Sequence, residues 1–267
     1  MLALWFNLPL GWLMPVTAAI YGAVAALIWW ITFRSPLRTA IQSLTGVVAP
    51  FFGAVALLFG LLLGFLASDI SDRNRAATRA LMSEADALRA VQTLSVAAAT
   101  DMSGIRDALR AYTQSMLKDE WPTMVEDGRS ATTEAAFGEL LRRVSDPAIG
   151  RDAGQAVAAA LLAGVARIGS ARSDRLALAE DHTNELKWLT VLILGIITQV
   201  AIALVHIERS RAQAAALTVF TVALVAALSL VAEQEQPFAG AVQVSPAPIA
   251  SVLALIAPKP VAASPSP

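Results

Sequence analysis

The sequence predicts an all-α, polytopic membrane protein with four transmembrane helices in two hairpins and a helical bundle domain inserted between them. Hydrophobic residues make up 56% of the 267 residues and charged residues only 15%, against about 25% in a typical soluble domain. The charges are also segregated, because 33 of the 41 charged side chains lie between Asp69 and Lys187. The four long runs outside that segment carry no charge.

The first span is expected over residues 16–33. Residues 1–33 carry no charged side chain, and Pro9 and Pro15 interrupt the first half of this stretch. A helix over the remaining residues just crosses a hydrocarbon core of about 30 Å. A secretory signal peptide is the alternative, but the stretch lacks a basic beginning and a small-residue cleavage site, and its apolar run is too long.

The other three spans are expected over residues 51–68, 188–205 and 212–232. Pro50 marks a kink or the beginning of the second span. Each run is long enough for a helix that satisfies its own backbone polar groups in hydrocarbon. Residues 1–68 and 188–232 are therefore the two hairpins.

The inserted domain, residues 69–187, has apolar residues at helical spacing throughout. Its helices are expected over 76–99, from Ser103 to near Pro122, over 133–144, and from Asp146-Pro147 to about Glu180. The first of these is compatible with one long helix that continues the second span. Residues 233–267 form a tail whose Pro- and Ser-rich end is expected to be disordered.

The two short connections, residues 34–38 and 206–211, hold four arginines. Short loops rich in Arg and Lys tend to stay in the cytoplasm. On this rule both short connections are cytoplasmic, and the inserted domain and both termini lie outside the cytoplasm.

Five residues of the second span are candidates for lining a pore. Gly53, Gly60 and Gly64 share one helix face, which permits close helix approach or a pore wall of little bulk. Phe52 and Phe59, seven residues apart, are candidates for a hydrophobic constriction. Ordinary helix packing is the favoured alternative for the glycines, and a core or lipid-facing position is the favoured alternative for the phenylalanines.

The inserted domain offers two charged candidates. Four carboxylates around Trp121-Pro122 are a candidate cation site: Asp119, Glu120, Glu126 and Asp127. The alternative is a solvated acidic turn. Arg172 and Arg175 are candidates for attracting anions near the mouth of the third span, and helix-surface salt bridges are the alternative.

Several classes of function find no support in the sequence. The chain has no cysteine and only two histidines, so no metal site and no cofactor are expected. No nucleophile elbow, phosphate loop or dinucleotide motif is present, so we expect no enzyme. No basic stripe is interleaved with aromatic residues, which argues against nucleic acid. The expected partners are the lipid bilayer, further copies of the chain and small inorganic ions.

Five short elements, taken in order, resemble the bacterial bestrophin-like family of unknown function. They are Arg79 to Leu94 with its Glu84-Ala-Asp-Ala-Leu88, Tyr112 with Glu120-Trp121-Pro122, Arg172-Ser-Asp-Arg175-Leu176, Trp188, and Pro237-Phe-Ala-Gly240 followed by Val244-Ser-Pro-Ala-Pro248. The likeness covers roughly residues 15–255. The chain departs from the family in His182-Thr-Asn184, which lacks a proline, and in the glutamates that precede Pro237.

The resemblance implies kinship to bestrophins, which are pentameric anion channels whose second span lines the pore. It also implies a cytosolic inserted domain, which opposes the arginine rule. With this resemblance, an oligomeric ion (anion) channel in a bacterial inner membrane is the first hypothesis. The second is a membrane-anchored sensor or scaffold whose helical domain binds a ligand or partner protein.

Overall fold

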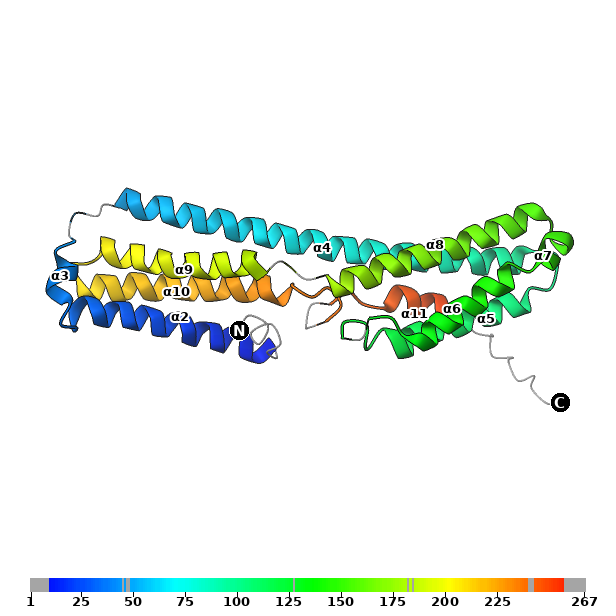
Figure 1. The fold of residues 1–267 in the computed structure, drawn as a ribbon, viewed down its shortest axis with the longest axis horizontal. Helices are drawn as coiled ribbons and strands as arrows, with labels where there is room; N and C mark the ends of the chain where they lie inside the picture. The colour runs from blue at the N-terminus through cyan, green and yellow to red at the C-terminus, as the bar shows by residue number, and fades with distance from the viewer. Residues whose placement is uncertain are drawn as a thin grey trace, which may run out of the picture. The chain divides into compact units, whose positions relative to one another are not determined.

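The computed structural model describes residues 10–44, 46, 49–126, 128–181, 183, 185–239 and 243–256 (Figure 1). Within these ranges every regular element is a helix: α2 (Leu10–Phe33), α3 (Arg38–Gln42), α4 (Ala49–Ala97), α5 (Ser103–Ser115), the π-helical turn η1 (Met116–Glu120), α6 (Ala131–Val144), α7 (Pro147–Asp152), α8 (Gln155–Glu180), α9 (Glu185–Val205), α10 (Ser210–Glu233) and α11 (Ala247–Ile256). Four helical stretches are long and apolar enough to cross a membrane. The all-α class with four membrane spans is confirmed.

The chain divides into two compact units. The membrane unit consists mainly of Met1–Asp72 and His182–Gln236, and the bundle unit mainly of Arg73–Asp181 with Pro237–Ala239 and the segment from Gln243 onward. Helix α4 contributes its first half to the membrane unit and its second half to the bundle unit, so the second span does continue as one long helix.

In the membrane unit, α10 packs against both α2 and α9. The apolar core contains Tyr21 of α2, Phe59 and Leu66 of α4, Trp188 of α9 and Leu228 of α10. Hydrocarbon offers no water to satisfy buried polar atoms, so polar side chains there must find partners inside the protein. These partners are largely the backbone and neutral side chains.

Three hydrogen bonds show this pattern. The Tyr21 hydroxyl donates to the carbonyl of Leu192 at 2.9 Å. The Gln199 amide nitrogen donates to the Thr221 hydroxyl at 2.9 Å. The Gln213 amide nitrogen donates to the carbonyl of Ala203 at 2.8 Å. Each bond joins two different helices, α2 with α9 or α9 with α10, so these polar residues help to fix the packing of the three helices.

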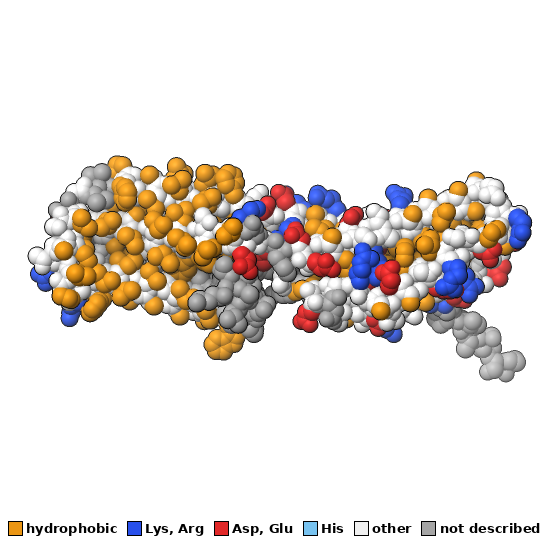
Figure 2. Space-filling model, in the orientation of Figure 1, with side chains coloured by type: hydrophobic (Ala, Val, Ile, Leu, Met, Phe, Trp, Pro, Cys, Tyr) orange, Lys and Arg blue, Asp and Glu red, His pale blue; other side chains and the backbone are white. Residues whose placement is uncertain are grey.

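The outer surface of the membrane unit is largely hydrophobic, whereas charged side chains gather on the bundle unit (Figure 2). The most apolar stretch of α4 is the least buried of those in α2, α4 and α10: 11% of it is buried, compared with 33% for α10. Large side chains such as Leu57, Phe65 and Val219 are more than half exposed. Such a surface is stable against acyl chains or another protein, not against water.

In the bundle unit, α5 packs against α6 and α11, and α8 packs against α6 and α7. The core takes Leu81, Leu88 and Val91 from α4, Leu109 and Tyr112 from α5, Leu140 from α6 and Leu161, Val165 and Ile168 from α8. Most of these residues lie on the faces that the apolar spacing predicts.

The structure corrects three predictions of element bounds. Helix α2 begins at Leu10, and Pro15 lies in its second turn, where it removes only one helical hydrogen bond near the beginning. The expected helix from Pro147 to Glu180 is two helices, because Gly154 adopts a φ of +92°, which breaks the helix. Asp146 does cap α7, since its side chain accepts from the Ala148 amide at 2.8 Å.

The third correction concerns the tail. Residues 247–256 form α11, and three of its side chains, Ile249, Val252 and Ile256, are buried in the bundle core. Arg110 donates to the Ile256 carbonyl at 2.8 Å and thereby satisfies the end of α11. The Pro- and Ser-rich end that was expected to be disordered lies outside the described residues.

Candidate functional site

A widened helical turn brings Glu120 into the bundle core. After Ser115 the helix continues as η1, and the Trp121 amide donates to the Met116 carbonyl, five residues back, at 2.8 Å. Single π-helical turns of this kind occur often at functional sites. Pro122 then ends the helix. The Glu120 side chain is fully buried as a result.

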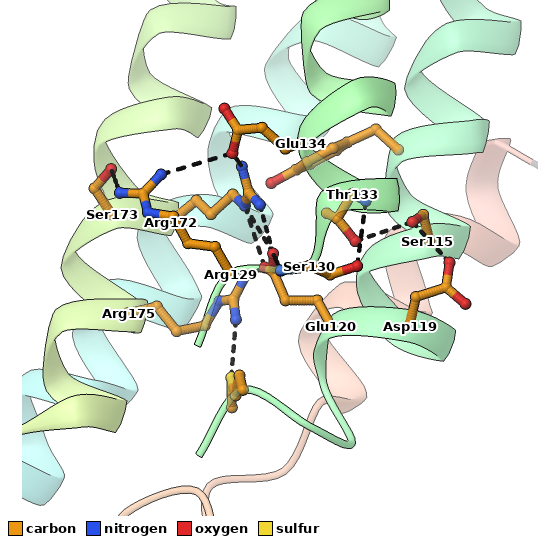
Figure 3. Close-up of polar contacts among 12 residues, drawn as sticks. Ser115, Asp119, Glu120, Arg129, Ser130, Thr133, Glu134, Arg172, Ser173 and Arg175 are labelled. Atoms are coloured by element: carbon orange, nitrogen blue, oxygen red, sulfur yellow. Dashed lines mark hydrogen bonds and ion pairs between the residues drawn. The ribbon is translucent and has the colours of Figure 1, made fainter. Parts of the chain in front are cut away.

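Two buried arginines, Arg172 and Arg175, lie against Glu120 (Figure 3), and a second buried glutamate, Glu84, pairs with Arg175. Arg172 of α8 donates from Nε to Glu120 Oε1 at 3.1 Å, and Arg175 donates from Nη2 to the same oxygen at 2.7 Å. Arg175 also donates from Nε to Glu84 Oε2 at 2.8 Å. We call Glu84, Glu120, Arg172 and Arg175 the buried ion network. It joins α4, η1 and α8.

Neutral groups complete the coordination of this network. The Tyr112 hydroxyl donates to Glu84 Oε1 at 2.7 Å. Arg175 Nη1 lies 3.0 Å from Met124 Sδ, and its guanidinium carbon lies 5.7 Å from the centroid of the Trp121 ring, a cation–π distance. The Trp121 ring in turn packs edge-on against Phe238, with centroids 5.7 Å apart.

The network reaches the surface through Glu134. Arg172 Nη1 donates to Glu134 Oε2 at 2.7 Å, and the same carboxylate lies 3.7 Å from Arg129. Glu134 and Arg129 are each about half exposed. Nearby, the Ser130 amide donates to Glu120 Oε2, and the Ser130 hydroxyl caps α6 by accepting from the Thr133 amide.

The charges of the buried ion network cancel, and the pKa values follow from the pairing. Burial raises the pKa of Glu120, but the hydrogen bonds and charges of Arg172 and Arg175 outweigh burial and hold that pKa below its ordinary value. Burial lowers the pKa of each arginine, and the glutamates outweigh it in turn and raise it. Burial, with Glu84 next, raises the pKa of the Tyr112 hydroxyl. Glu120 and both arginines are therefore ionised at neutral pH.

The buried ion network holds helices together, and it leaves few arginine N–H groups free to bind an anion. Carboxylates, Met124 and Trp121 surround the arginine donors, and the side chains of Arg172 and Arg175 are 3% and 0% exposed. The interpretation of these arginines as open, anion-attracting groups, and the alternative of surface salt bridges, both placed them in solvent. The structure places them in the core instead, because two carboxylates compensate for their desolvation.

The candidate cation site does not form among the described residues. Glu120 points into the core toward two arginines, whereas Asp119 and Glu126 are exposed, and Asp119 accepts from Ser115 at 2.8 Å. Asp127 lies outside the described residues. In the described part of the chain, no group of three or more acidic, His or Cys side chains is placed to hold a metal ion.

The five pore candidates divide into two groups. A methyl group built on Gly53, Gly60 or Gly64 would meet no atom within 4 Å, so this face of α4 is open. Phe59 is buried instead, and its ring packs edge-on against Phe220 of α10 with centroids 6.0 Å apart. Phe52, seven residues earlier, is half-buried. Within one chain, Phe59 therefore belongs to the core and lies off the open face.

Sequence reasoning missed Glu84, Tyr112 and Glu134 as partners of the arginines. A signal was present, since Glu84, Tyr112, Glu120, Trp121, Arg172, Arg175 and Phe238 all lie in the elements that carry the family resemblance. The structure gathers all of them in the bundle unit.

The fold and the site together define a four-span membrane protein with a charge-paired helical bundle. The chain belongs to the Bestrophin-like domain family, whose model matches residues 18–249. A sequence comparison with curated proteins finds no match.

Solved structures share the fold. A singly substituted bacterial bestrophin homologue from Klebsiella pneumoniae is similar with a TM-score of 0.68 and 13% identity, over 91% of this chain and 98% of that chain. The crystal structure of the homologue from the same organism phased on zinc gives a TM-score of 0.63 and 12% identity, over 91% and 95% of the two chains.

Proposed function

We propose that the protein is an oligomeric anion channel in a bacterial inner membrane, with its pore lined by the open face of α4. Membership of the Bestrophin-like domain family supports this function. The observation that carries the proposal is the open glycine face of the second span, because a pore or a neighbouring copy would account for a surface so little covered by its own chain.

Leu57 is the residue that we expect to narrow such a pore. It lies four residues after Gly53 and three before Gly60, so all three share one helix face. Its side chain is 71% exposed, which equals the highest exposure among the large hydrophobic residues described. Leu57 thus takes the role of hydrophobic constriction that Phe59, turned into the core, does not fill.

Chloride flux in liposomes tests the channel and its constriction together. We expect the purified oligomer to release chloride above the level of empty vesicles, and Leu57→Ala to change the rate severalfold, because it widens the narrowest ring. Leu58→Ala is the matched control: Leu58 is 55% exposed but lies about 100° around the helix. Absence of flux from a correctly assembled oligomer contradicts the channel, and equal effects of the two variants contradict the assignment of the pore face.

We also propose that the bundle unit faces away from the cytoplasm. The support is the arginine content of the short connections at 34–38 and 206–211. The kinship to bestrophins argues for the reverse, so a direct measurement is needed. The chain has no cysteine, which makes single-cysteine labelling straightforward.

For labelling the bundle unit, Ser145→Cys is a better position than Ser130→Cys. Ser145 is exposed at the end of α6, whereas the Ser130 hydroxyl caps that helix. An impermeant thiol reagent should label Ser145→Cys in intact cells and should label Ser210→Cys, exposed at the beginning of α10, only after lysis. The opposite pattern overturns this orientation and supports the bestrophin-like one.

A further inference from the structure

A groove in the membrane unit combines an apolar wall with a charged rim. It lies between α4 and α9 and has a volume of about 560 Å³. Leu62, Phe65 and Leu66 of α4 and Val191 of α9 form the apolar part. Ser68, Asp69, Asp72, Lys187 and Thr190 form the polar part.

The groove lies where the uncharged runs of both helices end. Asp69 is the first charged residue after the uncharged run of α4, and Lys187 is the last before that of α9. The charged rim therefore lies at the level where a bilayer changes from acyl chains to headgroups. A phospholipid has the same division, with apolar acyl chains beneath a polar headgroup, so it matches the apolar wall and the polar rim of this groove.

We propose that this groove binds a phospholipid with an amine-bearing, zwitterionic headgroup such as phosphatidylethanolamine. Lys187 supplies a positive charge for the phosphate, and Asp69 supplies a negative charge for the ammonium. The acyl chains lie along the exposed side chains of Leu62 and Phe65.

The charges of the rim favour this headgroup over the alternatives. Asp69 and Lys187 place opposite charges side by side on the rim, which suits a zwitterionic headgroup better than a purely anionic one. Trimethylated choline also carries a positive charge, but it has no N–H to donate to a carboxylate, so ethanolamine gains hydrogen bonds that choline lacks.

The existing ion pair does not block the headgroup. Lys187 Nζ pairs with Asp69 Oδ2, and the two side chains are 54% and 50% exposed. Pairs between groups this exposed contribute little to stability, so a phosphate and an ammonium can separate them at small cost. Both residues gain a partner of opposite charge in the exchange.

Native mass spectrometry of the purified protein with defined lipids tests the proposal. We expect phosphatidylethanolamine to be retained about fivefold more strongly than phosphatidylcholine or phosphatidylglycerol of the same chain length. Asp69→Asn should abolish the preference over choline, and Lys187→Gln should weaken binding of both zwitterionic lipids. Asp86→Asn, an exposed carboxylate of α4 in the bundle unit, is the matched control and should change neither.

Two outcomes overturn the proposal. Equal retention of the three lipids shows that the rim does not select a headgroup. Retention of none by an intact oligomer shows that the groove does not bind a phospholipid. Neither outcome bears on chloride flux, so the lipid site and the proposed channel are tested separately.

Discussion

The membrane unit buries Gln199, Gln213 and Tyr21, whereas the bundle unit buries the Glu84, Glu120, Arg172 and Arg175 network. These three side chains of the membrane unit are neutral, and each bonds to a carbonyl or a hydroxyl. A buried carboxylate of the same unit, Glu235, follows the end of α10 and accepts from the Trp188 indole at 3.1 Å. In the bundle unit the buried groups carry full charges that are cancelled by two carboxylates and two guanidinium groups.

The difference shows how the surroundings limit the choice of polar residues. An unpaired charge in hydrocarbon is very costly. In a membrane helix that inserts before its neighbours pack against it, a buried amide or hydroxyl therefore costs less free energy than a buried charge. A water-exposed bundle can bury charges because they become desolvated only when their partners close around them. A buried, paired charge then favours one packing of the helices, because any other packing leaves the charge without its partner.

The largest effect is expected from Arg175→Ala. The substitution leaves Glu84 and Glu120 in the core without the cation between them, which costs roughly 3–5 kcal/mol in the free energy of unfolding. Thermal unfolding of the purified protein in nanodiscs measures it. Arg167→Ala, which removes an exposed arginine of the same helix, should stay within about 0.5 kcal/mol. Similar losses of unfolding free energy in both variants would show that the buried ion network contributes no more to stability than an exposed arginine does.

The next largest effect is expected from Ile249→Ala in α11. Ile249 is fully buried in the bundle core, and removing its side chain leaves a cavity that costs roughly 2–5 kcal/mol. Leu255→Ala, on the same helix but 65% exposed, is the control and should change stability little. If both are neutral in a denaturation experiment, α11 does not belong to the core in solution.

Acid should weaken the bundle through Glu120. Because the pKa of Glu120 is lower in the folded chain than its ordinary value of 4.5, its contribution is complete above about pH 4.5–5 and is lost as pH falls through the lowered pKa. Melting temperatures between pH 7 and pH 3 should fall less steeply for Glu120→Gln than for the unchanged protein. Parallel curves would contradict the pairing, since the exposed carboxylates are common to both proteins.

The smallest effect is expected from Gln199→Leu in the membrane unit. It removes the hydrogen bonds to Thr221 and to the Tyr21 carbonyl, and such bonds between membrane helices contribute about 0.6 kcal/mol on average. The Gln199 Oε1 atom is buried without a hydrogen bond, which reduces the loss further. Unfolding in mild detergent measures it, with Leu189→Ala on the exposed face of α9 as control. A loss as large as that of Arg175→Ala would remove the contrast between the units.

The sequence predicts the four spans well, because the charges themselves mark where hydrocarbon ends, at residues such as Asp69 and Lys187. Helix ends at Pro122 and Pro147 are also predictable, because proline acts locally. The burial of Phe59 was not predictable, because every face of a transmembrane helix is apolar and the sequence does not show which face packs against other helices.

Three further features escaped prediction for different physical reasons. The ion network joins residues up to 91 positions apart, and local patterns carry no information about such pairing. Gly154 has the same neighbours as a glycine inside an Ala-rich helix, so its positive φ is invisible in the sequence. Helix α11 is short, and Pro246 and Pro248 beside its beginning made the segment resemble a linker.

The position of α11 in the chain has a consequence for biosynthesis. At about 5–20 residues per second, the ribosome needs roughly 10–30 s to proceed from Val91 to Ile256, two residues that share one apolar core. Throughout that interval the nascent chain presents an unfilled groove where α11 will dock. A holdase that recognises exposed aliphatic side chains should therefore engage the nascent polypeptide, and should be released once residues 247–256 have left the exit tunnel.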